Sequence, residues 1–129
     1  MSELLVATDT SQIVEGMRPK VEVAFAELVR FVKETEPRAI AYRVSFDPDG
    51  RHVTVFQVHP DSASMEYHME IAGPMFAKFR ELLRLREMHV YGRPSARLLE
   101  QLRNKVALLG TGSLTVHATF AGFDRSPTP

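Results

Sequence analysis

The spacing of apolar residues switches several times along this chain, from about every second position to about every 3.6 positions and back. The short period is typical of a strand, and the longer period is typical of an amphipathic helix. The clearest strands are two alternating runs at 40–46 and 52–58, which are separated by the turn residues Asp47-Pro48-Asp49-Gly50. We therefore expect a β-hairpin here, within a domain in which helices and strands follow one another.

Two helices are indicated on either side of this hairpin. Apolar residues recur at helical spacing from Met17 to Glu36, and Pro37 ends the pattern. After the hairpin, Asp61 or Ser62 can cap a second helix, in which Gly73-Pro74 is expected to cause a break. A further helical stretch is expected to continue from there to Leu83.

The remaining segments are shorter. The first strand is expected at Leu4–Ala7, with a possible bulged continuation to Val14, and a fourth strand is expected around Met88–Val90. Ser95 is expected to cap a short third helix, and Gly110-Thr111-Gly112 is expected to be a turn. A last strand is expected at 114–120. We interpret residues 1–125 as a single domain and residues 126–129 as a flexible tail.

This order of elements is that of a ferredoxin-like α+β sandwich, with helices on one face of an antiparallel sheet. The other face of the sheet also carries large side chains, for example Arg43 and Phe56. Because a large, partly apolar sheet face usually meets a partner, we expect a homodimer that pairs through these faces.

Composition excludes several classes of function. Sixteen basic and sixteen acidic side chains cancel, so neither nucleic acid nor a membrane surface is an expected partner. The chain contains no Cys, and its first residues lack a signal-peptide pattern, so a cytoplasmic location is expected. The histidines show no metal-ligand spacing and no accompanying acidic cluster, so no metal and no cofactor is expected. These histidines are His52, His59, His68, His89 and His117.

Several segments together resemble one known family. They are Glu36-Pro37 through Ala41-Tyr42, the strand leading into Asp61 and then His68, Tyr91-Gly92, and Ala121-Gly122-Phe123-Asp124-Arg125. In this order the chain resembles the antibiotic biosynthesis monooxygenase-like proteins of the dimeric α+β barrel superfamily. The resemblance implies a ferredoxin-like subunit, a dimeric barrel, and a pocket between sheet and helices. In characterised relatives, such a pocket can oxidise a quinol or polyketide-derived aromatic with molecular oxygen and without metal or flavin.

Candidate catalytic residues follow from the needs of that chemistry, which are a base, an apolar cavity and a donor for an oxyanion. His68 is the candidate base, because an imidazole titrates near neutrality. Tyr42 or Tyr67 could position a substrate hydroxyl, and Arg43 or Arg93 could stabilise the resulting negative charge.

Candidate substrate-binding residues form an adaptable apolar wall. Where relatives often have Glu and then Trp or Tyr, this chain has Gln57 and His59, which indicates a changed pocket. The substrate-binding set is Met65, Tyr67, Met69, Met75, Phe76, Phe79, Gln57 and His59.

Two main functions are consistent with this pattern. The first is a cofactor-independent monooxygenase that oxidises a quinol or polycyclic phenol. The second is a non-catalytic dimeric α/β barrel that binds a small aromatic or hydrophobic ligand. A third, isomerase or decarboxylase chemistry on a small keto acid or lactone, would use the same base and oxyanion groups.

Overall fold

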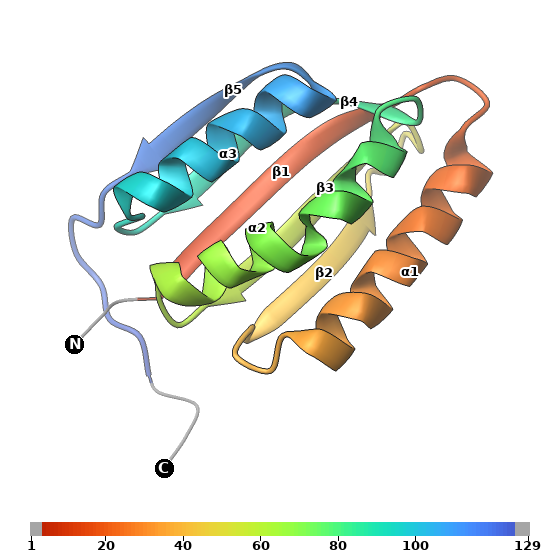
Figure 1. Cartoon of the computed structure of the whole chain (residues 1–129). Coiled ribbons are helices and arrows are strands. Elements are labelled where there is room, and N and C mark those ends of the chain that lie inside the picture. The colour runs from red at the N-terminus through yellow and green to blue at the C-terminus, as the bar shows by residue number, and fades with distance from the viewer. Residues whose placement is uncertain (1–3, 126–129) are drawn as a thin grey trace.

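The computed structural model describes residues 4–125, so the predicted tail at 126–129 lies outside the described residues. Strands and helices follow one another along the chain (Figure 1). The elements are β1 (Leu5–Ile13), α1 (Arg18–Thr35), β2 (Ala41–Phe46), β3 (His52–His59), α2 (Ser62–Phe76), the 3₁₀ helix η1 (Ala77–Phe79), β4 (Leu83–Tyr91), α3 (Ala96–Leu109) and β5 (Gly110–His117).

The strands of residues 4–125 form one five-stranded sheet in the order β2-β3-β1-β4-β5. The pairs β2·β3, β3·β1 and β1·β4 are antiparallel, whereas β5 runs parallel to β4. The predicted ferredoxin-like α+β unit consists of β1, α1, β2, β3, α2 and β4, and α3 and β5 are appended to it. The α+β prediction is confirmed, and the parallel fifth strand makes the sheet mixed rather than wholly antiparallel.

Three helices cover one face of the sheet over the described part of the chain, and the core lies between these two layers (Figure 1). In β1 every second residue faces the helices, and this set includes the polar Asp9 and Ser11. The polar residues explain why the apolar pattern of β1 stops early in the sequence, although the strand continues to Ile13. A register shift does occur between Thr10 and Ser11 of β1, where it pairs with β4.

Helix α2 corrects the prediction of a helix broken at Gly73-Pro74. It continues through both residues to Phe76 and then tightens into η1. A proline removes one backbone hydrogen bond from a helix interior. Here the helix still buries Met69, Ala72 and Phe76 on both sides of that position. We infer that this packing outweighs the cost of the proline.

The strand and helix after η1 are both longer than expected. Strand β4 begins at Leu83, which was predicted to be helical, because Leu83 and Leu85 alternate with exposed arginines and face the core. Helix α3 extends to Leu109 and is followed directly by β5, so the predicted turn at Gly110–Gly112 is wrong. The glycines are needed because a Cβ on Gly110 would lie 2.6 Å from the Leu85 carbonyl oxygen. Strand β5 accordingly starts earlier than predicted and ends at His117.

The second face of the sheet carries no helix in the described structure (Figure 1). The strand registers place Val6, Thr8, Arg43 and Phe56 on this open face. Across β4 and β5, the rings of Tyr91 and His117 stack there with centroids 4.5 Å apart. Among the described residues, no helix is both long enough and apolar enough to cross a membrane.

Candidate functional site

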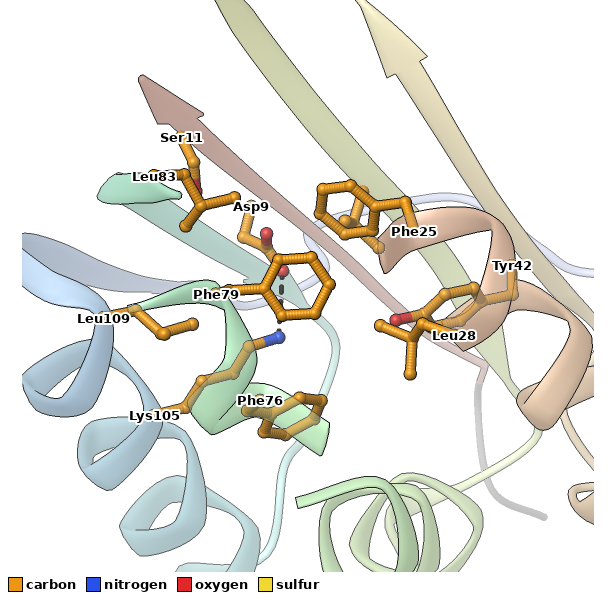
Figure 2. Close-up of a pocket in the computed structure, with 11 residues that line it drawn as sticks. Asp9, Ser11, Phe25, Leu28, Tyr42, Phe76, Phe79, Leu83, Lys105 and Leu109 are labelled. Atoms are coloured by element: carbon orange, nitrogen blue, oxygen red, sulfur yellow. Dashed lines mark hydrogen bonds and ion pairs between the residues drawn. The ribbon is translucent and has the colours of Figure 1, made fainter. Parts of the chain in front are cut away.

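A small cavity lies between the sheet and the helices, with polar side chains in an otherwise apolar wall (Figure 2). Its volume is about 20 Å³, which is room for about one water molecule. The residues that line it come from every layer of the fold. They are Asp9, Ser11, Phe25, Leu28, Tyr42, Val55, Phe76, Phe79, Leu83, Lys105 and Leu109.

Asp9 and Lys105 form a buried ion pair at this cavity. The Lys105 Nζ lies 3.2 Å from the Asp9 Oδ2, and the two side chains are 6% and 7% exposed. Asp9 comes from β1 and Lys105 from α3, and Figure 2 shows the lysine reaching across the cavity to the carboxylate. The Lys105 Nζ also lies 4.6 Å from the centroid of the Phe76 ring.

Tyr42 projects from β2 so that its hydroxyl points into the same cavity (Figure 2). Burial of the side chain raises the pKa of Tyr42 well above its usual value, and the negative charges of Asp9 and Glu36 raise it further. The hydroxyl therefore stays protonated at neutral pH and can donate a hydrogen bond.

Behind the wall of the cavity, His68 of α2 forms a second buried pair with Glu36. The His68 Nδ1 lies 2.9 and 2.8 Å from the two Glu36 carboxylate oxygens, and the side chains are 0% and 2% exposed. The His68 Nε2 is buried and has no hydrogen-bond partner in the described structure. The His68 ring packs against Tyr42 and Phe76, with centroids 5.2 and 5.8 Å away. Both of those residues line the cavity.

A neutral histidine lies beside this pair. The His59 Nε2 donates to the Gln57 Oε1 at 2.8 Å, and the His59 Nδ1 lies 2.8 Å from the Ser64 hydroxyl. The pKa of His59 is lowered to about 4, mainly by burial and to a lesser extent by the neighbouring His68. His59 is thus uncharged at neutral pH, and its ring lies 5.9 Å from that of His68.

Tyr42 also lines a larger groove on the surface. The groove has a volume of about 260 Å³ and runs between the end of α1 and the start of β2, where Val32, Glu36 and Ile40 also line it. Tyr42 is therefore common to the linings of both spaces.

The structure brings only part of the sequence-predicted site together. Tyr42, Phe76 and Phe79 line the cavity, and His68, Gln57 and His59 lie in the polar network behind it. Met65 and Met69 are buried in the core, whereas Met75 packs at its edge.

Three further candidates lie away from the cavity. Tyr67 is 48% exposed on α2 and lines a surface groove near Pro37. Arg43 lies on the open face of the sheet, opposite Phe56, and so faces away from Tyr42. Arg93 is exposed in the loop before α3.

The sequence interpretation missed Asp9, Lys105 and Glu36. Asp9 lies at an inward position of β1, where the alternation of apolar residues in the sequence has already stopped. Lys105 lies between Leu102 and Val106 on the side of α3 that faces the core. A charged residue on the buried side of a periodic pattern was the available signal. The pairing itself could not be read, because Asp9 and Lys105 are 96 residues apart.

One acidic cluster does accompany a histidine, which differs from the expectation. In the turn between β2 and β3, ligand atoms of Asp47, Asp49 and His52 lie within 4.8 Å of one another. The backbone N–H of Arg51 donates to Asp49 at 2.8 Å, and His52 lies 2.8 Å from the other oxygen. Those contacts lower the pKa of Asp49, with the Arg51 hydrogen bond as the largest cause. The group is an ordered turn on the surface, and we assign it no function.

Comparison with known proteins yields solved structures only. No family model and no curated protein matches the sequence. MupZ from Pseudomonas fluorescens superposes with a TM-score of 0.75 at 17% identity, covering 98% of both chains. SnoaB from Streptomyces nogalater, a cofactor-independent oxygenase, superposes at 0.61 with 14% identity over 74% of this chain and 97% of its own. A protein from Chloroflexus aurantiacus, provisionally named an antibiotic biosynthesis monooxygenase, superposes at 0.60 with 16% identity over 73% of this chain and 96% of its own.

The chain has the fold of the antibiotic biosynthesis monooxygenases. The resemblance noted in the sequence is thereby confirmed at the level of the fold. The match to SnoaB covers about three-quarters of the chain, whereas the match to MupZ covers nearly all of it.

Proposed function

We propose that this protein is a cofactor-independent monooxygenase that oxidises a quinol or polycyclic phenol in the space between sheet and helices. The observation that carries the proposal is the buried His68–Glu36 pair, which leaves the His68 Nε2 without a partner next to the cavity wall. The similarity of fold to SnoaB, a cofactor-independent oxygenase, supports the same reaction class.

His68 is the base in this proposal. His68 Nδ1–H donates a hydrogen bond to the Glu36 carboxylate, which fixes the tautomer and leaves a lone pair on Nε2. When Nε2 takes the hydroxyl proton of a phenol, or of the enol form of an anthrone, the positive charge on the imidazole forms beside Glu36 and is stabilised by it until the proton leaves in the product water. The substrate is left as an electron-rich anion that molecular oxygen can attack.

The oxidation balances without a cofactor when the reacting ring carbon carries two hydrogens, as in an anthrone. One oxygen atom of O₂ becomes the new carbonyl oxygen of the product. The other oxygen atom leaves as water together with the two hydrogens that the carbon loses. The substrate supplies all the electrons that reduce the oxygen.

The cavity is too small to hold the substrate while Tyr42 stays in the position that the structure shows, so the substrate enters past this side chain in our proposal. Tyr42 lines both the cavity and the surface groove, and its ring packs against the His68 ring. When Tyr42 turns away, the two spaces join and the substrate hydroxyl reaches Nε2. The aromatic wall of Phe76 and Phe79 then packs against a flat ring.

The second candidate function is a non-catalytic dimeric barrel that binds a small hydrophobic ligand. The surface groove of about 260 Å³ favours it, because a ligand bound there needs no access to the buried His68, whereas the cavity of about 20 Å³ is too small for a ligand of either kind. A His68–Glu36 pair that only stabilises the core would be equally buried.

Oxygen uptake separates the two functions. We would measure it with hydroquinones, naphthalenediols and anthrones, without added metal or flavin, for the wild-type protein and His68→Gln. The monooxygenase predicts saturable uptake above the autoxidation blank that falls about 100-fold in the variant, which is the low end of the effect of a general base. Uptake equal to the blank for every compound would leave ligand binding as the better account.

A homodimer that pairs through the open sheet faces is part of the proposal. Phe56 is 36% exposed on that face, and Tyr91 at its edge is 44% exposed. The segment after β5 carries Phe120 and Phe123, which are 102% and 78% exposed and contribute nothing to the core of their own chain. We propose that these two rings pack onto the partner subunit, because large apolar side chains that stay outside the core of their own chain often meet another protein surface.

A further inference from the structure

Lys105 is a buried cation that the proposed reaction does not yet use. Its side chain is 6% exposed, and within residues 4–125 the Asp9 carboxylate is the one hydrogen-bond acceptor found for it. A lysine ammonium carries three N–H donors. Two of them are therefore left for other acceptors, at an atom that lines the cavity.

Stability alone does not account for the Asp9–Lys105 pair. A buried ion pair loses the hydration of both charges, and apolar residues of similar size often stabilise a fold as well or better. Around this pair the wall of the cavity is apolar, with Phe25, Leu28 and Leu109 close by (Figure 2). A charged pair in this setting indicates a role toward something that enters the cavity.

We propose that Lys105 binds the oxyanion of the substrate, and that the substrate class is a weakly acidic phenol or enol bound in its ionised form. This inference rests on the proposed function, which supplies the premise that the substrate is an aromatic compound with an acidic hydroxyl. The Lys105 Nζ lies 4.6 Å from the centroid of the Phe76 ring, so a substrate that enters beside Phe76 presents its oxygen to Nζ. Once the substrate has entered and Tyr42 has turned back to the position seen in Figure 2, its hydroxyl donates a second hydrogen bond to the same oxygen.

Asp9 holds Lys105 in this position while the cavity is empty. Its carboxylate also repels an incoming anion, because Asp9 and the oxyanion compete for the same ammonium. Loss of the Asp9 charge and loss of the Lys105 charge should therefore change anion binding in opposite directions. A pair that only stabilises the fold would weaken binding in both cases.

Anaerobic binding of p-nitrophenol tests this assignment, since its ionised and neutral forms absorb at different wavelengths. The neutral control ligand is 4-nitrotoluene. The variants are Lys105→Met, Lys105→Arg and Asp9→Asn, and Lys78→Met is the control for loss of a surface lysine, since Lys78 is 59% exposed.

The wild-type protein is expected to bind p-nitrophenol as the anion. Lys105→Met should lower affinity for the anion about tenfold, which corresponds to one pKa unit of the bound ligand. Asp9→Asn should raise that affinity by a similar factor, and Lys105→Arg and Lys78→Met should keep it. Affinity for 4-nitrotoluene should be the same in all folded variants.

Equal losses for the anion and for 4-nitrotoluene in Lys105→Met would overturn the assignment, as would binding of p-nitrophenol only in its neutral form or not at all. If Lys105→Met does not fold, the other two variants test the assignment. Affinity for the p-nitrophenol anion should then rise in Asp9→Asn and stay unchanged in Lys105→Arg, and any other result would overturn the assignment. Oxygen is absent from this experiment, so a failure of the oxygenase proposal appears only in oxygen uptake and leaves anion binding intact.

Discussion

At the scale of single residues, the His68–Glu36 pair is expected to stabilise the fold as well as to serve chemistry. Glu36→Ala leaves a buried imidazole without its carboxylate, so the free energy of unfolding should fall by about 3–5 kcal/mol. The exposed Arg18–Glu22 pair is the control, because Glu22→Ala should cost no more than about 0.5 kcal/mol. Urea unfolding measures both, and equal small losses would show that the buried pair contributes little.

His59 should make stability depend on pH. In the unfolded chain its pKa is 6.5, whereas burial lowers the pKa to about 4 in the folded protein. Between these values the unfolded chain takes up a proton that the folded chain does not. The stability contribution is therefore complete above pH 6.5 and declines as the pH falls, by about 3 kcal/mol at pH 4.

The matched variant for this effect is His59→Gln, which does not titrate. Its free energy of unfolding would be measured by urea at several pH values. Between pH 6.5 and 4, this free energy should change less steeply with pH than that of the wild type, by up to the slope that the uptake of one proton produces. Asp49 and Asp61 have lowered pKa values and lose their contributions as the pH falls through their ordinary pKa of 3.8, at the lower end of this window and equally in both proteins. An unchanged slope in His59→Gln would contradict the assignment of a neutral, buried His59.

The sequence predicted which residues face the interior better than it predicted which residues they contact there. Local periodicity placed Tyr42, Phe76 and Phe79 inward, and all three line the cavity. It could not pair Glu36 with His68, because that contact depends on how the end of α1 meets α2 in three dimensions. Long-range packing of this kind leaves no trace in a single stretch of sequence.

At the scale of elements, the glycines have opposite roles that substitution should reveal. A Cβ on Gly73 would meet nothing within 4 Å, and the residue lies inside α2. Gly73→Ala should therefore stabilise the protein by about 0.5–1 kcal/mol. Gly110→Ala should destabilise it by about 1–3 kcal/mol, because its Cβ would lie 2.6 Å from the Leu85 carbonyl oxygen.

Thermal unfolding of the two glycine variants checks both signs. Loss of stability in Gly73→Ala would mean that α2 needs a flexible position beside Pro74. A neutral Gly110→Ala would mean that β5 does not lie as close to β4 as the structure has it.

Elements with local signals were predicted well, whereas those that depend on tertiary contacts were not. The hairpin of β2 and β3 carries its own turn residues, Asp47-Pro48-Asp49-Gly50, and its strands alternate cleanly. Helix α2 was predicted to break at Gly73-Pro74, but core packing keeps it continuous. Strand β5 starts at glycines that resemble a turn, because they allow close approach to the β4 backbone.

At the scale of the whole molecule, the open face of the sheet should decide the oligomeric state. Phe56→Glu puts a charge on that face, and we expect it to convert a dimer into a monomer at micromolar concentration. Val23→Glu is the control, since Val23 is 61% exposed on α1, on the helix side of the molecule. Sedimentation velocity of the three proteins tests this, and a monomeric wild type or a dimeric Phe56→Glu would contradict the proposed interface.

The most direct test of the central claim is the rate at which the protein transfers oxygen from ¹⁸O₂ to an anthrone. Mass spectrometry would follow the quinone product formed by wild type, by His68→Gln and by a blank without protein. The account predicts one labelled oxygen atom per product molecule, a wild-type rate well above the blank, and a rate close to the blank for His68→Gln. Product formed no faster than in the blank, or at the same rate by both proteins, would contradict a monooxygenase that uses His68 as its base.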